Sequence, residues 1–487
     1  MRLAPAIVGF MLSTASKAKA DGDVTFMLSW LHRKWPAWAV EPFLACLALW
    51  AVVFFVESRI EKKQDPKAKK EKRSKASSKD FKAFQRQWLV VYLLTMLADW
   101  LQGTHMYTLY TEYNQPVGTL YAIGFTSSAV FGTFLGLYVD KYGRRLGCIA
   151  FCVLELVINV LEHFNDTTLL IVGRVLGGMS TSLLFSAFES WMVSEHRKRG
   201  FPEDDIAQTF AIAQVGNGIM AVLAGVLAQV SADNFGNIGP FQLAIFLTAL
   251  VLVFVCFWPE NYGGRERTGD GKDDDQHMFK DAWMCIVNDK RILLLGLIQS
   301  FFEGAMYTFV IMWVPTLAGM VPGGEKGKMD FAAFSQGQGW IFSSMMVCIS
   351  LGGQTFEGMI KVMSVERGCV FIFALASLSM LVPIFVKDFF VVLTSFLLLE
   401  ACVGASFGAL ATMRSHFLPD SLQASVMNIF RIPLNILVVT GARCGDLLPP
   451  WMVFGVAAGW FAVATLLQVY LYTSASTKGK SGKNKNE

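Results

Sequence analysis

The chain has 487 residues, of which 54% are hydrophobic and only 16% are charged, with a formal net charge of +4. Soluble globular domains carry about 25% charged residues, so this composition argues against an ordinary soluble protein and favours one that crosses a membrane many times. The small net charge gives no indication of nucleic-acid binding. The nine cysteines form no CxxC and no zinc-like spacing. Neither a disulfide framework nor a metal site is therefore indicated, and no cofactor is expected.

The N-terminal region is predicted to add one helix to the main set. Residues 1–41 contain a short apolar run and small side chains, which fits a cleavable targeting peptide or a disordered terminus. A first hydrophobic helix is predicted over 42–58. The linker 59–83 is rich in lysine and arginine, and the positive-inside rule places it in the cytoplasm as a solvated segment. Contact with anionic lipid head groups is the less favoured alternative.

Twelve further apolar stretches suit membrane-spanning helices. Their predicted bounds are 84–106, 118–139, 146–162, 169–192, 207–230, 240–258, 291–314, 335–356, 369–386, 389–411, 421–442 and 451–473. A hydrophilic central loop, 260–290, divides them into bundles at 84–259 and 291–473, followed by a basic cytoplasmic tail at 474–487. Lysine and arginine residues, Arg414 among them, concentrate on the loops that are expected to face the cytoplasm. This asymmetry supports the predicted number of spans.

A short charged turn joins the second and third predicted spans. Gly136 and Gly143 are placed at its two bends, since glycine tolerates tight turns. Asp140 lies close to Arg144 and Arg145, and these charges suit ion pairing and the dipoles of helix ends. The pattern G-x-x-x-D-[RK]-x-G-R-[RK] resembles the signature loop of the major facilitator superfamily. The resemblance implies an all-α membrane protein of two six-helix bundles, here with an extra N-terminal helix, and a gating role for this loop.

Ionisable side chains inside the predicted spans are candidates for function, because each costs roughly 2.5–3.5 kcal/mol at the bilayer centre. They are Asp99, Glu155, Arg174, Glu189, Glu303, Glu357, Glu400 and Arg431. Some have a simpler interpretation. A structural role is the favoured interpretation of Glu155. For Glu189 and Glu357 the favoured interpretation is an ion pair with an arginine of a loop. Arg174 suits either coupling or an ion pair with an acid.

Helical spacing places several candidates on polar faces. These faces are Gln299, Glu303 and Tyr307 in the seventh of the twelve spans, and Asn428, Arg431 and Asn435 in the eleventh. Arg431 is favoured as a substrate ligand because it lies mid-helix, has amides on both sides and has no acid on its own stripe. Arg174 is the next candidate.

Further sequence blocks resemble the molybdate-anion transporter family within that superfamily. They are Ala-Asp-Trp-Leu-Gln-Gly at 98–103, Leu-Phe-Ser-Ala-Phe-Glu-Ser-Trp at 184–191, Glu-Asn-Tyr at 260–262 and Phe-Arg-Ile-Pro-Leu at 430–434. The resemblance runs from about 80 to 470 and implies high-affinity molybdate uptake. A tetrahedral dianion needs guanidinium groups and neutral donors in place of its hydration shell. Arg431 with Asn428 and Asn435 offers this combination, joined by Gln299 and Tyr307.

Energetics then constrain how such an anion enters a cell. Moving a dianion inward against 100 mV, inside negative, costs about 4.6 kcal/mol, so uptake requires compensating cations. We therefore expect proton symport by alternating access, with Asp99, Glu303 or Glu400 taking protons as the anion binds. The expected setting is a monomer in the plasma membrane.

Other functions remain open at this stage. One is proton-coupled uptake of sulfate, a sugar or an organic acid, and another is a transport-inactive receptor or scaffold on the same fold. The intact signature loop and the charges inside the spans argue against a scaffold. An enzyme is not expected, because no nucleophile–base constellation and no phosphate-binding glycine loop is visible. An ion channel is not expected either, because the sequence contains neither the rings of charge nor the repeated filter loops that a channel needs.

Overall fold

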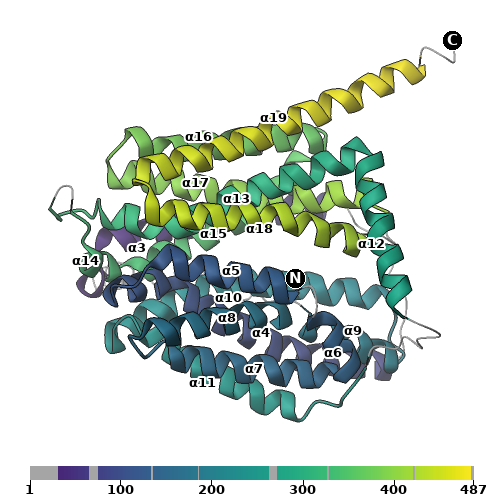
Figure 1. Ribbon diagram of the computed structural model, residues 1–487, viewed down its shortest axis with the longest axis horizontal. Helices are drawn as coiled ribbons and strands as arrows, with labels where there is room; N and C mark the ends of the chain where they lie inside the picture. The colour runs from purple at the N-terminus through teal and green to yellow at the C-terminus, as the bar shows by residue number, and fades with distance from the viewer. Residues whose placement is uncertain are drawn as a thin grey trace.

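The computed structural model describes residues 31–64, 75–132, 135–184, 186–262, 271–325, 328–419 and 423–483. Within these ranges the secondary structure is helical and contains no strand. The helices form two bundles that lie side by side with their axes running in nearly the same direction (Figure 1). The predicted all-α, two-bundle architecture is confirmed.

The N-terminal bundle occupies the lower half of Figure 1. Its helices are α4 (Lys75–Glu112), α5 (Val117–Gly132), α6 (Leu135–Tyr142), α7 (Arg144–Leu161), α8 (Thr167–Leu184), α9 (Ala187–Lys198), α10 (Asp204–Phe235) and α11 (Gly239–Cys256). α4 packs against α10 and α11, α5 against α8, and α7 against α8 and α11. At one end of the core the rings of Trp191 and Trp258 stack at 3.9 Å, and both side chains are buried.

The C-terminal bundle occupies the upper half. Its helices are α13 (Lys290–Ala318), α14 (Phe331–Ser335), α15 (Gln338–Met359), α16 (Val365–Phe385), α17 (Phe389–Phe417), α18 (Gln423–Leu447) and α19 (Pro450–Lys483). α13 packs against α18 and α19, and α16 packs against α17 and α19. Phe302 lies at the centre, with ring centroids 4.8 Å from Phe373 and 5.0 Å from Phe461.

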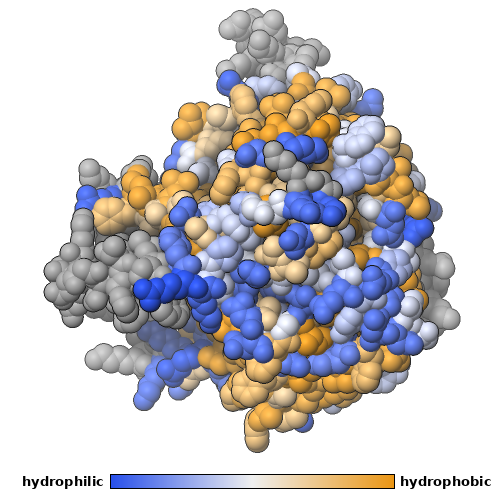
Figure 2. All heavy atoms as spheres, turned by 90° about the vertical axis from the view of Figure 1, so that its left-hand side faces the viewer, coloured by the Kyte–Doolittle hydropathy of each residue, from blue (hydrophilic) through white to orange (hydrophobic). Residues whose placement is uncertain are grey.

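The bundles meet along two helix pairs, α5 with α18 and α10 with α15. We call the two ends of the molecule the α14 end and the α12 end, after the helices found there (Figure 1). Figure 2 faces the α14 end, where hydrophilic residues gather across the middle and hydrophobic residues surround them. This is the pattern expected of a surface that emerges from a bilayer, because the apolar sides face lipid.

Eight described helical segments are long and apolar enough to cross a membrane, and they lie in both bundles and in the extra N-terminal helix. Large apolar side chains point outward from them, such as Phe246 and Leu466, which are 65% and 68% exposed. A soluble protein would leave such a surface in water, whereas a bilayer covers it. The chain is therefore a multi-pass membrane protein.

The extra helix, α3 (Ala37–Gln64), packs against α15 of the C-terminal bundle. Trp50 Nε1 donates to Ser350 Oγ at 2.9 Å, and the ring of Trp38 stacks on Phe334 at 6.0 Å. The helix begins before the predicted start at 42. Pro42 therefore lies inside the helix, in its second turn, where its missing N–H removes one intrahelical hydrogen bond.

Other boundaries also differ from the sequence-based expectation. The central loop 260–290 contains a helix, α12 (Gly271–Asn288), which joins one bundle to the other at the α12 end (Figure 1). Ala282 and Ile286, one turn apart, are buried against the C-terminal bundle, and this packing stabilises the helix. α19 continues to Lys483, so most of the predicted tail is helical. Gly136 lies in α6 and not at a bend. Of the predicted N-terminal segment 1–41, residues 1–30 lie outside the described part, whereas residues 37–41 belong to α3 and are not disordered.

Candidate functional site

The polar face predicted on α13 is present and gains a partner from α17. Gln299 Nε2 donates to Glu303 Oε1 at 2.8 Å, one helical turn away. Arg414 Nη1 of α17 donates to Gln299 Oε1 at 3.2 Å. The amide of Gln299 therefore connects a guanidinium group to a carboxylate. Arg414 therefore belongs to the site, whereas the sequence pattern predicts it on a loop.

Arg431 of α18 reaches the same place from another side. Its charge interacts electrostatically with Glu303 and with Tyr307, which follows Glu303 by one turn on α13. Its Nη1 atom also lies 4.0 Å from the position that a Cβ would take on Gly132 of α5. The Arg431 side chain is exposed, and it extends from the C-terminal bundle to the N-terminal bundle.

An aromatic contact completes this junction of the bundles. The ring of Tyr307 meets the ring of Phe125 of α5 edge-on, with centroids 5.0 Å apart. Asn435 lies one turn beyond Arg431 on α18 and is half-buried, whereas the side chain of Asn428 lies outside the described part. The structure therefore brings Gln299, Glu303, Tyr307 and Arg431 together at the seam of the two bundles.

The charges at this seam suit a small oxyanion. The guanidinium groups of Arg414 and Arg431 carry two positive charges, and an ionised Glu303 carries one negative charge. The local net charge is +1 when Glu303 is ionised and +2 when it is protonated. Arginine forks bind tetrahedral oxyanions bidentately, and amide and phenol groups supply neutral hydrogen bonds beside them.

Arg174 lies elsewhere, within the N-terminal bundle. Its Nη2 forms an ion pair with Glu162 Oε1 at 2.5 Å, and the hydroxyl of Tyr110 donates to the same oxygen at 2.9 Å. The Glu162 side chain is fully buried and that of Arg174 is 12% exposed. Of the two roles predicted for Arg174, coupling and an ion pair with an acid, the structure shows the ion pair. Glu162 was missed because it is the last residue of a predicted span.

The other two carboxylates proposed for proton coupling occupy separate places. Asp99 interacts electrostatically with Glu155, which accepts hydrogen bonds from Gln102 Nε2 at 2.7 Å and Ser180 Oγ at 2.5 Å. Glu400 is buried in α17 within the C-terminal bundle. Among the described residues neither carboxylate interacts with the arginines of the seam, so Glu303 is the proton candidate that lies beside them.

The signature turn is a capped helix start. Gly143, with a φ of +122°, separates α6 from α7, as predicted for that bend. Glu260 caps α7, accepting from the N–H groups of Arg145 at 2.8 Å and Leu146 at 3.1 Å. A carboxylate at a helix N-terminus satisfies unpaired N–H groups and the positive end of the dipole. Arg144 N donates to the Asn261 carbonyl. The side chain of Asp140 lies outside the described part.

Hydrogen bonds join the two bundles at the α14 end. Gln338 Nε2 donates to the Thr104 carbonyl, and Thr108 Oγ1 donates to Gln338 Oε1, both at 2.6 Å. α10 and α15 approach so closely that a Cβ on Gly339 would lie 2.2 Å from the Gly225 carbonyl oxygen. Glycine is required there because any side chain would collide with backbone.

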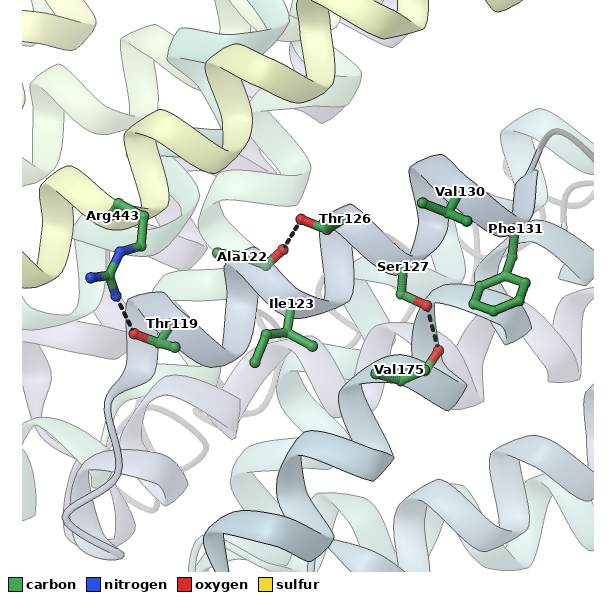
Figure 3. A pocket seen from close by; sticks show the side chains of 9 residues that line it. All are labelled: Thr119, Ala122, Ile123, Thr126, Ser127, Val130, Phe131, Val175 and Arg443. Atoms are coloured by element: carbon green, nitrogen blue, oxygen red, sulfur yellow. Dashed lines mark hydrogen bonds between the residues drawn. The ribbon is translucent and has the colours of Figure 1, made fainter.

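A groove of about 440 Å³ runs along α5, apart from the polar seam (Figure 3). Its wall is mostly apolar, with Ile123 and Val130 of α5 and Val175 of α8 on it, and Arg443 of α18 stands at one end. None of the predicted substrate-binding residues whose side chains the structure describes lines it. We therefore place the polar site at the seam, since an apolar groove cannot replace the hydration of a small anion.

Comparisons with known proteins agree with this architecture. A family model described as sugar transporters with 12 transmembrane spans matches residues 60–409. The molybdate-anion transporter of Xenopus tropicalis is 30% identical over 412 residues, covering 81% of this chain and 84% of that protein. The molybdate-anion transporter of Xenopus laevis is 32% identical over 414 residues, covering 82% and 85%.

Solved structures support the fold. The nucleoside transporter NupG superposes with a TM-score of 0.64 at 12% identity, covering 80% of this chain and 99% of that one. A bacterial homolog of the human lysosomal transporter Spinster, in an inward-facing and unoccupied conformation, gives a TM-score of 0.58 at 12% identity and covers 82% and 99%. At this identity the likeness establishes the shared fold.

Proposed function

The chain belongs to the molybdate-anion transporter family of the major facilitator superfamily, and on this basis we propose that it carries molybdate across a membrane through the seam between its bundles. The observation that carries this proposal is the convergence of Arg414 and Arg431 on Glu303, at a place that α5 of the other bundle also reaches. A substrate held there contacts both halves of the protein.

The charge at the seam favours a dianion. Two guanidinium groups balance the two negative charges of molybdate, and their planar forks match a pair of oxygen atoms on a tetrahedral anion. Gln299 and Tyr307 add neutral hydrogen-bonding groups that replace water. Asn435 lies one turn from Arg431 and extends this lining along α18.

Glu303 links the anion to a proton. Its carboxylate and the molybdate dianion are attracted to the same guanidinium groups, so an ionised Glu303 weakens anion binding. A proton on Glu303 removes the competing charge and raises the local net charge from +1 to +2. Proton and anion therefore bind together, as a symporter requires. Two protons would make the import of one dianion electroneutral, and Asp99 or Glu400 would take the second.

Alternating access follows from how the bundles are joined. The hydrogen bonds described above connect them at the α14 end, and the positive-inside rule assigns that end to the outside. The arrangement supports a state closed to the outside, from which molybdate leaves into the cytoplasm. The capped turn at Gly143 belongs to the opposite end, where the bundles approach each other when the path closes there. For uptake into the cell the plasma membrane is the setting.

Uptake of labelled molybdate at nanomolar concentration tests this function. Wild type and Arg431→Ala are compared at equal surface expression, with and without excess sulfate, and Arg197→Ala serves as a control because Arg197 is an exposed surface arginine. We expect saturable uptake that resists sulfate, persists in the control and falls at least tenfold in Arg431→Ala. Complete competition by sulfate would instead identify a transporter of tetrahedral dianions in general. No uptake by the wild type would contradict the proposal.

A further inference from the structure

We propose that the groove along α5 binds one phospholipid from the leaflet at the α14 end, with an acyl chain against α5 and its phosphate on Arg443. The groove is the cavity of about 440 Å³ described above, and its volume is typical of sites that hold small molecules. This inference concerns a site separate from the anion seam, and it is independent of which solute the protein carries.

The wall of the groove suits a hydrocarbon chain. Ile123, Val130 and Phe131 line it from α5, and Val175 lines it from α8 (Figure 3). The hydroxyls of Thr126 and Ser127 are already used, because they donate to the Ala122 and Val175 carbonyls within the protein at 2.7 and 2.6 Å. The groove therefore offers an acyl chain an apolar surface without unsatisfied donors.

The length of the groove matches one leaflet. Its α5 lining runs from Thr119 to Phe131, and a rise of 1.5 Å per residue gives about 18 Å. Half of a hydrocarbon core of about 30 Å is about 15 Å. Thr119 follows the start of α5 by two residues, so this end of the groove lies at the level of the head groups and the other end lies near the bilayer midplane.

A cation stands at the head-group end. The Arg443 side chain is 45% exposed, and its Nη1 donates to Thr119 Oγ1 at 2.5 Å. Asp446 lies 3.4 Å from the same nitrogen, but its two oxygens also accept from the Gly118 N–H and the Thr119 hydroxyl, each at 2.8 Å. A guanidinium has five N–H donors, so Arg443 keeps donors on its exposed side for a phosphate oxygen.

The position of Arg443 ties this lipid to the conformation of the protein. Arg443 belongs to the C-terminal bundle, whereas Thr119 and the apolar lining belong to the N-terminal bundle. The complete site, with its apolar wall and its cation, exists when α5 and α18 meet at the α14 end. A bound phospholipid therefore stabilises the state in which this end is closed.

Photocrosslinking in nanodiscs tests the site. The probe is a phospholipid with a diazirine in its acyl chain, and the labelled peptides are mapped by mass spectrometry for wild type, Arg443→Gln, Thr126→Trp and Lys328→Gln. Thr126 is exposed, so tryptophan there fills the groove without repacking the core. Lys328→Gln removes an exposed charge that is paired with Glu325 and serves as the matched control.

We expect labelling of residues 119–131 in wild type to exceed that of other lipid-facing helices. It should fall about fivefold or more in Arg443→Gln and in Thr126→Trp, and it should be unchanged in Lys328→Gln. A diazirine diacylglycerol, which lacks the phosphate, should label this segment more weakly than the phospholipid. Labelling spread evenly around the protein, or labelling of 119–131 that survives Arg443→Gln, would overturn the proposal.

Discussion

Asp446 of α18 caps a helix of the opposite bundle, because its Oδ1 accepts a hydrogen bond from the Gly118 N–H at the start of α5, at 2.8 Å. Helix caps are usually supplied by the residue just before the helix, whereas this one comes from a residue 328 positions away. A Cβ on Gly118 would lie 2.3 Å from the Ala442 carbonyl oxygen, so glycine permits the close approach. The cap therefore exists only while the two bundles are joined at the α14 end.

Replacing Asp446 by alanine should open this end more often. Loss of a carboxylate cap costs about 1 kcal/mol, which corresponds to about a fivefold shift in the equilibrium between joined and separated bundles. Spin labels at Phe235 and Phe385, which are exposed residues of α10 and α16, report the separation by pulsed electron resonance. We expect a larger population at long distance in Asp446→Ala.

Asp388→Ala is the matched control for that experiment. Asp388 also caps a helix by accepting from a backbone N–H, that of Val391 at 3.0 Å, but this contact lies within one bundle. Its loss should lower stability without changing the distance between the labels. Identical distance distributions in Asp446→Ala and wild type would show that the cap does not hold the bundles together.

The close contact between α10 and α15 should not tolerate a side chain at position 339. In Gly339→Ala the new Cβ would lie 2.2 Å from a backbone oxygen of Gly225, so the two helices must separate. In Gly353→Ala, on the same helix, the nearest such atom is 3.9 Å away. We expect the first variant to lower the thermal unfolding temperature in detergent by several degrees, and the second to leave it unchanged or raised by better helix propensity. Equal effects would contradict the close approach.

The sequence predicts that helices lie in the long apolar stretches, but it does not predict where some of them are divided: the predicted spans 118–139 and 169–192 each fall on two helices, α5 with α6 and α8 with α9. It predicts the polar face Gln299–Glu303–Tyr307, since neighbours on a helix are fixed by its periodicity. It also predicts the bend at Gly143. Local pattern is enough for each of these predicted features.

The partners of these residues depend on tertiary packing and could not be predicted. Glu260 reaches the start of α7 from beyond α11, and Glu162 meets Arg174 across two helices. Arg414 was assigned to a loop because the apolar stretch ends at 411, whereas α17 continues to Phe417 and carries Arg414 into the site. An apolar stretch therefore identifies the membrane-spanning part of a helix, but the helix itself can continue by a polar turn beyond that stretch.

Gly143→Ala should destabilise the signature turn for two reasons. The residue has a φ of +122°, which is unfavourable for alanine, and its Cβ would lie 2.6 Å from the Glu260 carboxyl carbon. Gly200→Ala separates the two effects, because Gly200 has a φ of +69° with no atom within 4 Å of its Cβ position. We expect a clearly larger drop in thermal unfolding temperature for Gly143→Ala. A drop no larger than that of Gly200→Ala would mean that the Glu260 cap adapts freely.

Removing Arg174 should leave Glu162 as a buried, uncompensated acid. Loss of one partner of such a pair costs about 3–5 kcal/mol, so Arg174→Ala should unfold at a markedly lower temperature. The double variant with Glu162→Gln should recover part of the loss, because the neutral amide needs no counter-charge. A single variant as stable as the wild type would contradict the structural importance of this pair.

The exposed pair of Arg197 and Glu203 gives the contrasting case. The hydrogen bond from Arg197 holds the pKa of Glu203 below its ordinary value. The contribution of this pair to the free energy of unfolding is therefore present above the ordinary carboxylate pKa. It is lost as the pH falls through the pKa that Glu203 has in the folded state. Since both side chains are more than half exposed, Arg197→Ala should leave the unfolding temperature nearly unchanged at neutral pH. A large decrease would show that the pair is less solvated than it is in the structure.

The affinity of the purified protein for molybdate, measured at pH 6 and pH 8 for wild type, Glu303→Gln and Arg431→Ala, tests whether the seam binds the anion together with a proton. We expect tighter binding at the lower pH for wild type and tight, pH-independent binding for Glu303→Gln. For Arg431→Ala we expect binding about thirtyfold weaker, from the loss of about 2 kcal/mol in charge-assisted hydrogen bonds. Wild-type affinity in Arg431→Ala, or an unchanged pH dependence in Glu303→Gln, would contradict this proposal.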